Sequence, residues 1–191
     1  MIEKIDKFEV DYQKLKNDFN YIMDKAFPSG FNSDTVINNT NVNGVNGTLQ
    51  INLRGQDFFQ EVHPQNLPEH IKTLEDFKAF FSFWHESVPE YTKNIIETLC
   101  RQENYDFTRA RYLFLAPGRG LTLHRDAGIR YHFVIETNPG SLFYFVDDDK
   151  EARDAEVYHL EKCNYFYKAD TRRTHFFYNS GNTVRIHLVI S

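Results

Sequence analysis

Short β-rich runs separated by turn-forming residues fill the chain from Arg111 to Ser191. The runs read RYLFLAP, IRYHFVIE, SLFYFV, AEVYHLE, NYFYK, THFFYN and TVRIHLVI. They are separated by an acidic stretch and by the turn sequences PG, NPG and NSGN. Short strands at this spacing, interrupted by turn chemistry, are typical of a β-sandwich or jelly roll. The sequence therefore predicts a mostly β fold with flanking helices.

The chain before these runs has a largely helical pattern. Asp11 and Thr73 suit helix N-caps, and Pro89 suits the first turn of a third helix. The apolar positions at helical spacing are Tyr12, Leu15, Phe19, Ile22 and Met23, then Leu74, Phe77, Phe80, Phe81 and Trp84, and finally Tyr91, Ile95, Ile96 and Leu99. Each set forms one stripe on its helix, which predicts packing against a core rather than a cofactor site.

These patterns predict one domain over residues 1–191. Within it, residues 1–105 form a helical and mixed part, with short strands expected at 2–10 and 48–54. Residues 106–191 form the β core that carries the metal site proposed below.

Three stretches predict loops. Residues 31–47 are rich in Asn and Gly, and a lid over a pocket is one interpretation of a loop of this length. Residues 56–70 contain two prolines and predict an irregular connection. The acidic stretch DDDKEARDAE lacks the ligand spacing and central Gly of a calcium loop, which favours a solvated hairpin tip.

Composition narrows the class of protein. Apolar residues make up 41% of the 191 residues and aromatic residues 16%, which argues against a disordered chain. A net charge of −5, without a long Lys or Arg cluster, argues against nucleic-acid binding. No apolar run is long enough to cross a membrane, and no signal-peptide core follows the first residues. With only two cysteines, the sequence predicts a cytoplasmic protein.

Potential metal ligands and arginines recur at defined spacings in the β-rich region. His124 and Asp126 are two residues apart, so on a strand they would share a face and could bind one divalent metal. His175 follows fifty residues later, and Arg185 ten residues after that. We expect the three potential ligands to form one site, with the arginines binding an anion beside it.

The run after Asp126 predicts how one strand divides its faces. If residues 129–136 form a strand, Ile129, Tyr131, Phe133 and Ile135 share a wholly apolar face. The other face carries Arg130, His132, Val134 and Glu136, and we expect it to line the pocket with Arg130 nearest the metal. An internal salt bridge of Arg130 with Glu136 or Asp126 is the alternative.

The joint pattern resembles a known family. His124-x-Asp126, the distal His175 and Arg185 resemble the Fe(II)- and 2-oxoglutarate-dependent oxygenases. The pair Arg130-x-His132 and the ending with Asn179 and RIHL resemble the aspartyl/asparaginyl β-hydroxylase group, which includes small amino-acid hydroxylases. The vertebrate protein hydroxylase that names the group lacks the carboxylate ligand, which this chain keeps. The resemblance covers residues 111–191.

The resemblance implies a double-stranded β-helix core and a set of residue roles. His124, Asp126 and His175 would be the Fe(II) ligands and the catalytic centre, leaving positions for 2-oxoglutarate and O₂. Arg185 would bind the distal carboxylate of 2-oxoglutarate, and Arg130 with His132 the carboxylate nearer the metal. The implied reaction is hydroxylation of an amino acid, a peptide side chain or a small metabolite, with release of succinate and CO₂.

Alternatives remain open at this stage. A metal-dependent cupin-type isomerase or lyase uses the same barrel, and a non-enzymatic β-sandwich binding protein needs no metal. His187 shares the Arg185 face and is either a hydrogen-bonding group beside the site or a core histidine. Arg172 and Arg173 either contact substrate at the pocket mouth or are ordinary exposed arginines. The partner is a small-molecule or peptide substrate, and the oligomeric state stays open.

Overall fold

The computed structural model describes residues 1–38, 47–55, 57–59, 71, 73–147 and 154–191. The strands are β1 (Ile2–Ile5), β2 (Thr48–Asn52), β3 (Ala110–Leu115), β4 (Arg119–Gly120), β5 (Arg130–Glu136), β6 (Ser141–Phe145), β7 (Glu156–His159), β8 (Phe166–Ala169), β9 (His175–Asn179) and β10 (Arg185–Ile190). The helices are α1 (Tyr12–Ala26), α2 (Ser33–Ile37), α3 (Leu74–Phe80) and α4 (Glu90–Gln102).

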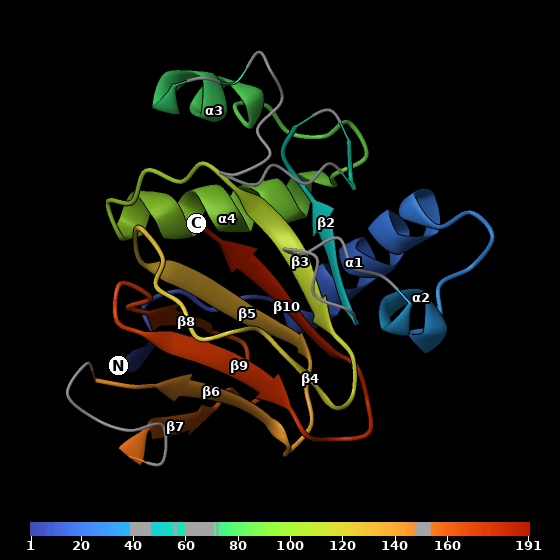
Figure 1. Cartoon of the computed structure of the whole chain (residues 1–191). Coiled ribbons are helices and arrows are strands. Elements are labelled where there is room, and N and C mark those ends of the chain that lie inside the picture. The colour runs from blue at the N-terminus through green and yellow to red at the C-terminus, as the bar shows by residue number, and fades with distance from the viewer. Residues whose placement is uncertain (39–46, 56, 60–70, 72, 148–153) are drawn as a thin grey trace.

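The strands form two antiparallel sheets (Figure 1). The larger has the order β1-β8-β5-β10-β3-β2, and the smaller has the order β4-β9-β6-β7. From β3 to β10 the chain changes sheet at every connection except the hairpin β6–β7. This alternation is the connectivity of a double-stranded β-helix, so the predicted jelly roll is confirmed. The early strands β1 and β2 add to the two edges of the larger sheet.

Side chains from both sheets meet in an inner apolar layer. It joins the larger sheet, through Leu115 and Val134, to the smaller sheet, through Phe143, Phe145 and Phe177. The Phe143 ring centre lies 3.9 Å from that of Phe177, on the neighbouring strand. The two sheets therefore face each other around a filled apolar interior.

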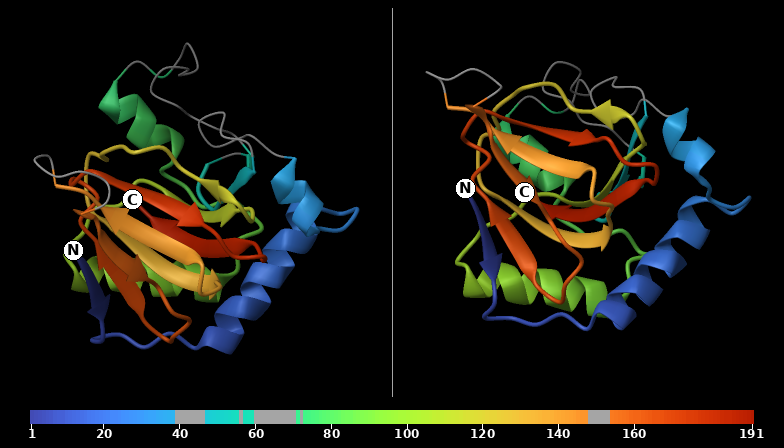
Figure 2. Two further views of the ribbon diagram at one scale, coloured as in Figure 1. Left: turned by 60° about the horizontal axis from the view of Figure 1, so that its bottom comes forward. Right: turned by 90° about the horizontal axis from the view of Figure 1, so that it is seen from below.

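The outer face of the larger sheet packs against helices. Figure 2 shows α1 and α4 lying along this side of the molecule. Buried residues of α1 and α4 join the outward side chains of β3, β5 and β10 in one large core. Tyr131, Phe133 and Ile135 belong to this core, whereas Val134 belongs to the inner layer, as their alternation predicted. The strand β5 thus holds His132 toward the space between the sheets, beside Phe143 and Phe177 of the smaller sheet.

The helix boundaries follow their capping residues closely. The Asp11 carboxylate accepts a hydrogen bond of 3.1 Å from the Lys14 N–H, and Thr73 and Asp76 form a capping box. Pro89 is the N-cap of α4 rather than part of its first turn.

A polar contact joins the helices α1 and α4. The Asp18 carboxylate on α1 accepts hydrogen bonds from the Thr92 N–H (3.0 Å) and the Thr92 hydroxyl (2.7 Å) on α4.

Two expectations for the N-terminal part need correction. The stripe of α3 was expected to reach Trp84, but the helix ends at Phe80. The segment around Trp84 instead pairs with the backbone at Arg54, because extended pairing satisfies its polar groups there. Residues 33–37, expected as loop, form the short helix α2. The lid interpretation concerns residues 31–47, of which 39–46 lie outside the described residues, and the irregular connection concerns residues 56–70, of which 56 and 60–70 lie outside them.

No helix in the described ranges is long and apolar enough to cross a membrane.

Candidate metal centre

The segment that carries His124 and Asp126 is irregular, so the prediction that both residues lie on a strand is wrong. After the two-residue strand β4, regular pairing stops and only His124 forms an isolated bridge with His175. The two backbones exchange hydrogen bonds of 3.0 and 2.9 Å, so the two histidines lie side by side. The Asp126 N–H then donates to the Thr171 carbonyl (2.9 Å). Arg125, between the ligands, points elsewhere and donates to the Thr174 hydroxyl.

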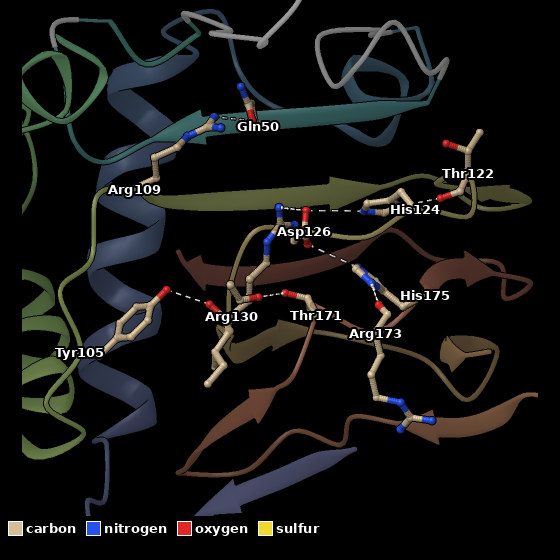
Figure 3. A network of polar contacts seen from close by, with 12 residues as sticks. Gln50, Tyr105, Arg109, Thr122, His124, Asp126, Arg130, Thr171, Arg173 and His175 are labelled. Carbon is tan, nitrogen blue, oxygen red and sulfur yellow. Dashed lines mark hydrogen bonds and ion pairs between the residues drawn. The ribbon is translucent and has the colours of Figure 1, made fainter. Parts of the chain in front are cut away.

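This backbone arrangement brings three potential ligands together. Ligand atoms of His124, Asp126 and His175, here called the metal triad, all lie within 4.8 Å of one another. The His124 Nε2 atom is 3.9 Å from one oxygen of Asp126, and His175 Nε2 is 3.4 Å from the other. Figure 3 shows the two imidazoles and the carboxylate converging. The i and i+2 positions thus meet at one site although they lie on no strand.

Backbone carbonyls fix the tautomer of both imidazoles. The Nδ1 atom of His124 lies 2.6 Å from the Thr122 carbonyl oxygen, and that of His175 lies 2.9 Å from the Arg173 carbonyl oxygen. Because a carbonyl only accepts, each Nδ1 carries the proton and each Nε2 keeps a lone pair for a metal. Burial lowers the pKa of His124, which further favours its neutral form.

Two polar atoms of the triad, 3.4 Å from each other, are buried and form no hydrogen bond within the described residues. Among the described residues, Asp126 Oδ2 and His175 Nε2 make no hydrogen bond. Burial opposes ionisation of Asp126, but His175 and the positive charge of Arg130 outweigh it, and the pKa of this carboxyl is lowered. Buried polar groups without partners are rare in native proteins, and each requires an explanation. A divalent cation bound by two Nε2 atoms and a carboxylate would satisfy both.

Arg130 is positioned against the triad by its neighbours. Its guanidinium donates to Asp126 Oδ1, so the internal salt bridge considered above is present. The Tyr105 hydroxyl donates to the Ile129 carbonyl (2.7 Å), and the Thr171 hydroxyl donates to the Gly128 carbonyl. These contacts, drawn in Figure 3, fix the turn between the ligands and β5. A cation therefore lies directly beside the triad.

Arg185 is buried between the sheets, and no carboxylate of the described residues pairs with it. Only 6% of its surface is exposed, and it forms none of the ion pairs found among the described residues. Its Nη2 lies 2.8 Å from His187 Nδ1, and its guanidinium carbon lies 4.7 Å from the Phe177 ring centre. The His175 ring centre is 5.8 Å from the same phenyl ring, so one side chain separates Arg185 from the triad. Burial lowers the pKa of Arg185 to about 9, and it stays charged at neutral pH.

His132 and His187 lie between these charged groups. Each is 1% exposed, and their ring centres are 5.7 Å apart. In the described part of the chain, neither nitrogen of His132 has a hydrogen-bond partner. Burial lowers the pKa of both imidazoles well below the usual value, so both are neutral. His187 accepts from Arg185 and is therefore a hydrogen-bonding neighbour of the site.

A small cavity lies beside Arg185. It has a volume of about 20 Å³ and is lined by Thr48, Leu113, Phe114, Leu115, Leu121, Phe177 and Arg185. This is room for about one water molecule. A larger ligand at Arg185 therefore requires the side chains of the lining to move.

The structure also places three other charged residues. The position of Glu136 differs from the one expected, and the roles of Arg172 and Arg173 had two interpretations. Glu136 does not face the pocket, because it pairs with Lys16 of α1 (2.6 Å) and with Lys162 (3.2 Å). A register shift in the β5–β10 pairing at this point turns the end of the strand outward. Arg172 pairs with Asp170, and Arg173 pairs with Asp147 and Glu156. Both arginines are therefore neutralised by carboxylates in this structure.

The sequence analysis missed one buried cation, Arg111 on β3. It is 5% exposed, and it shares the inward face with Leu113 and Leu115. The run RYLFLAP placed it at a strand end, where arginines are ordinarily exposed. Only its period-two relation to Leu113 and Leu115 could have indicated an inward side chain.

Comparisons with known proteins give remote structural similarities. No family model matches the chain, and no curated protein matches it. A 2OG-Fe(II) oxygenase family oxidoreductase from Burkholderia pseudomallei is 11% identical, with a TM-score of 0.44 over 54% of this chain and 56% of that one. The chain thus spans little more than half of that protein.

Two further structures show similarly remote likeness. A cupin domain from Bordetella pertussis is 15% identical, with a TM-score of 0.36 over 45% of this chain and 81% of that one. The non-heme alpha ketoglutarate dependent epimerase SnoN from nogalamycin biosynthesis is 9% identical, with a TM-score of 0.35 over 44% and 45% of the two chains. Similarity at this level assigns neither a family nor a reaction.

Proposed function

We propose that this protein is an Fe(II)- and 2-oxoglutarate-dependent dioxygenase that hydroxylates an amino acid, a peptide side chain or a small metabolite and releases succinate and CO₂. One observation carries the proposal. A His/Asp/His set with converging ligand atoms lies one side chain away from a buried arginine that has no carboxylate partner among the described residues. The first part suits a divalent metal, and the second suits an anionic ligand that reaches the metal.

The metal triad fits Fe(II) by its donor chemistry. Two imidazoles and one carboxylate form the ligand set of non-haem iron oxygenases, which leaves coordination positions free. The carbonyls of Thr122 and Arg173 hold the two imidazoles so that Nε2 is the donor. When bound, Fe(II) and 2-oxoglutarate would supply the oxidising chemistry that uses O₂.

Arg185 would hold the distal carboxylate of 2-oxoglutarate. Its guanidinium is already enclosed and desolvated, so a carboxylate could form two parallel charge-assisted hydrogen bonds there. His187 accepts from one nitrogen and so restricts the orientation of the fork. The Phe177 ring under the guanidinium limits its movement further. The role of this part of the chain is to position the cosubstrate against the metal.

Arg130 and His132 would hold the carboxylate of 2-oxoglutarate that lies nearer the metal. Arg130 already contacts Asp126, so binding there would place a cation between the metal ligand and the cosubstrate. His132 has two unpartnered ring nitrogens in the described interior and can donate from one of them. The Arg130-x-His132 pair is also what supports the narrower likeness to the aspartyl/asparaginyl β-hydroxylase group.

The test is succinate release from 2-oxoglutarate with Fe(II) and O₂, followed by mass spectrometry. Amino acids and peptides are screened as substrates for a gain of one oxygen atom. We expect slow succinate release alone and faster release with a true substrate. Arg172→Gln is the matched control, since it removes an arginine that is paired with Asp170 and mostly exposed.

The outcomes separate this proposal from its rivals. Stoichiometric metal binding without any consumption of 2-oxoglutarate would refute it and favour a cupin-type isomerase or lyase. Absence of metal binding would favour a binding module, because the triad would then have no chemical role.

A further inference from the structure

Two of the three potential metal ligands lie on a loop between β4 and β5. The described residues 121–129 form no strand, although His124 makes an isolated bridge with His175. We call residues 124–128 the ligand loop. A metal site requires each ligand to be held in one orientation by its surroundings. Because regular sheet pairing does not hold the ligand loop, other contacts must fix Asp126.

The turn between β8 and β9, residues 170–174, provides such contacts. The Thr171 carbonyl accepts a hydrogen bond of 2.9 Å from the Asp126 N–H. Directly after the turn, the backbone of His175 exchanges hydrogen bonds of 3.0 and 2.9 Å with that of His124. The turn therefore leads into one potential ligand and lies against the other two.

Thr171 contacts the ligand loop a second time, through its side chain. Its hydroxyl donates to the Gly128 carbonyl (Figure 3). The residue is 0% exposed, and its branched Cβ leaves the hydroxyl few directions in which to point. The carbonyl and the hydroxyl of Thr171 thus fix the backbone on both sides of Ala127. The backbone of Asp126 lies directly before this segment and is held with it.

The backbone at Asp126 decides where the two oxygens of its short side chain lie. Oδ1 accepts from the Arg130 guanidinium, and Oδ2 lies 3.4 Å from His175 Nε2. A shift of this backbone would move Oδ2 away from the imidazole even if the contact with Arg130 persisted. The geometry of the metal triad therefore depends on what holds the ligand loop.

The turn itself is anchored at the edges of both sheets. The Asp170 N–H donates to the carbonyl of Met1, which precedes the edge strand β1 of the larger sheet (3.3 Å). Arg173 pairs with Asp147 (2.6 Å) and with Glu156 on β7, the edge strand of the smaller sheet (2.8 Å). The turn is thus a fixed support against which Thr171 can position the ligand loop.

We propose that Thr171 is a positioning residue of the metal triad, whose buried hydroxyl holds the ligand loop so that Asp126 presents Oδ2 to a bound divalent metal. The inference rests on the metal site of the proposed function and adds a residue that determines its affinity. Without the hydroxyl, the Gly128 carbonyl loses this donor and the loop can adopt other orientations. Groups that orient metal ligands typically change metal affinity by a factor of about 10 to 100 when they are replaced.

The test measures the Kd of Co(II) by competition with a chelator, in the absence of 2-oxoglutarate. Thr171→Val keeps the shape of the side chain and removes its hydroxyl, and we expect it to weaken Co(II) binding about 10- to 100-fold. Thr171→Ser keeps the hydroxyl and should bind Co(II) within about threefold of wild type.

Thr92→Val is the matched control. Thr92 on α4 is also 0% exposed, and its hydroxyl donates to the Asp18 carboxylate on α1 (2.7 Å). Thr92→Val and Thr171→Val should both lower the Tm, because each variant loses a buried hydrogen bond. The Co(II) affinity of Thr92→Val should equal that of wild type, because this hydrogen bond joins two helices and not the ligand loop.

The visible spectrum of bound Co(II) supplies a second readout, because it reports the arrangement of the metal ligands. At saturating Co(II), the spectrum of Thr171→Val should differ from that of wild type, since Asp126 is no longer held in one orientation. Thr171→Ser and Thr92→Val should reproduce the wild-type spectrum. A residue that only stabilised the fold would leave the spectrum unchanged.

Three results would overturn the inference. They are a wild-type Co(II) affinity and spectrum in Thr171→Val, an equal loss of affinity in Thr171→Val and Thr92→Val, and a loss in Thr171→Ser as large as that in Thr171→Val. Should Thr171→Val not fold, Thr171→Ala also removes the hydroxyl and is measured with the same expected results. Failure of the proposed reaction is distinguishable, because wild type would then bind Co(II) but consume no 2-oxoglutarate with Fe(II).

Discussion

Replacing Arg185 should separate cosubstrate binding from folding. In the structure its guanidinium is 6% exposed, contacts His187 and Phe177, and forms none of the described ion pairs. The charge is therefore already desolvated before a ligand arrives, and a carboxylate gains almost the full strength of the two hydrogen bonds. Hydrogen bonds to charged groups contribute about 1.5–3 kcal/mol each. Two of them are worth roughly 3–6 kcal/mol, which is a factor of at least 100 in affinity.

Two variants distinguish charge from geometry. Arg185→Gln should raise the apparent KM for 2-oxoglutarate at least ~100-fold, because both bonds lose their charge. Arg185→Lys should raise it roughly tenfold, since lysine keeps the charge but loses the fork. The free energy of unfolding without 2-oxoglutarate should not fall in Arg185→Gln, because its amide can still donate to His187 and an unpaired buried charge is gone.

The assay is succinate release as a function of 2-oxoglutarate concentration, with iron content measured on the same samples. Denaturant unfolding supplies the stability comparison. Arg172→Gln, which removes an exposed arginine paired with Asp170, should behave as wild type in both assays. An apparent KM within twofold of wild type in Arg185→Gln, at equal iron content, would refute the assignment of the distal carboxylate.

Three further predictions concern the metal triad, Arg130 and an ion pair outside the site. Changing any residue of the triad to Ala should lower bound iron and abolish turnover, and two such variants with normal iron content and activity would disprove the triad. Arg130→Ala should slow decarboxylation of 2-oxoglutarate without prime substrate by roughly 10- to 100-fold; normal decarboxylation with lost hydroxylation would make Arg130 a substrate contact. The hydrogen bond from Lys168 lowers the pKa of Glu103, so the stability from this pair is present above the ordinary glutamate value near ~4.3 and is lost as the pH falls below it. Denaturant midpoints at neutral and acidic pH should therefore differ less in Glu103→Gln than in wild type, and an equal difference in both would contradict the assignment.

Local sequence patterns were sufficient to predict those parts of the structure that depend on contacts between neighbours along the chain. The caps at Asp11 and Thr73 are side-chain to backbone contacts within one turn, so the helix starts were predictable. The alternation on β5 assigned Tyr131 and Phe133 to the outer core, because a strand turns successive side chains to opposite faces. The same alternation failed at Glu136, where a register shift against β10 ends it.

In the candidate site, too, residue types were predictable from the sequence and their positions were not. The three potential ligands were identifiable from residue type and spacing, and the structure brings their side chains together. Their local geometry was not readable, because His124 and Asp126 are positioned by hydrogen bonds to His175 and Thr171, far away in the sequence.

The sequence by itself determined the alternation of short strands, the starts of α1 and α3 and the set of chemical groups available for a site. Only the tertiary structure decided which of those groups are buried without a partner. Arg111 lies in β3 and Arg172 lies three residues after β8, yet the first is enclosed between the sheets and the second pairs with Asp170 at the surface. The physical reason is that the cost of burying a charge depends on what surrounds it, and strands distant in sequence supply those surroundings.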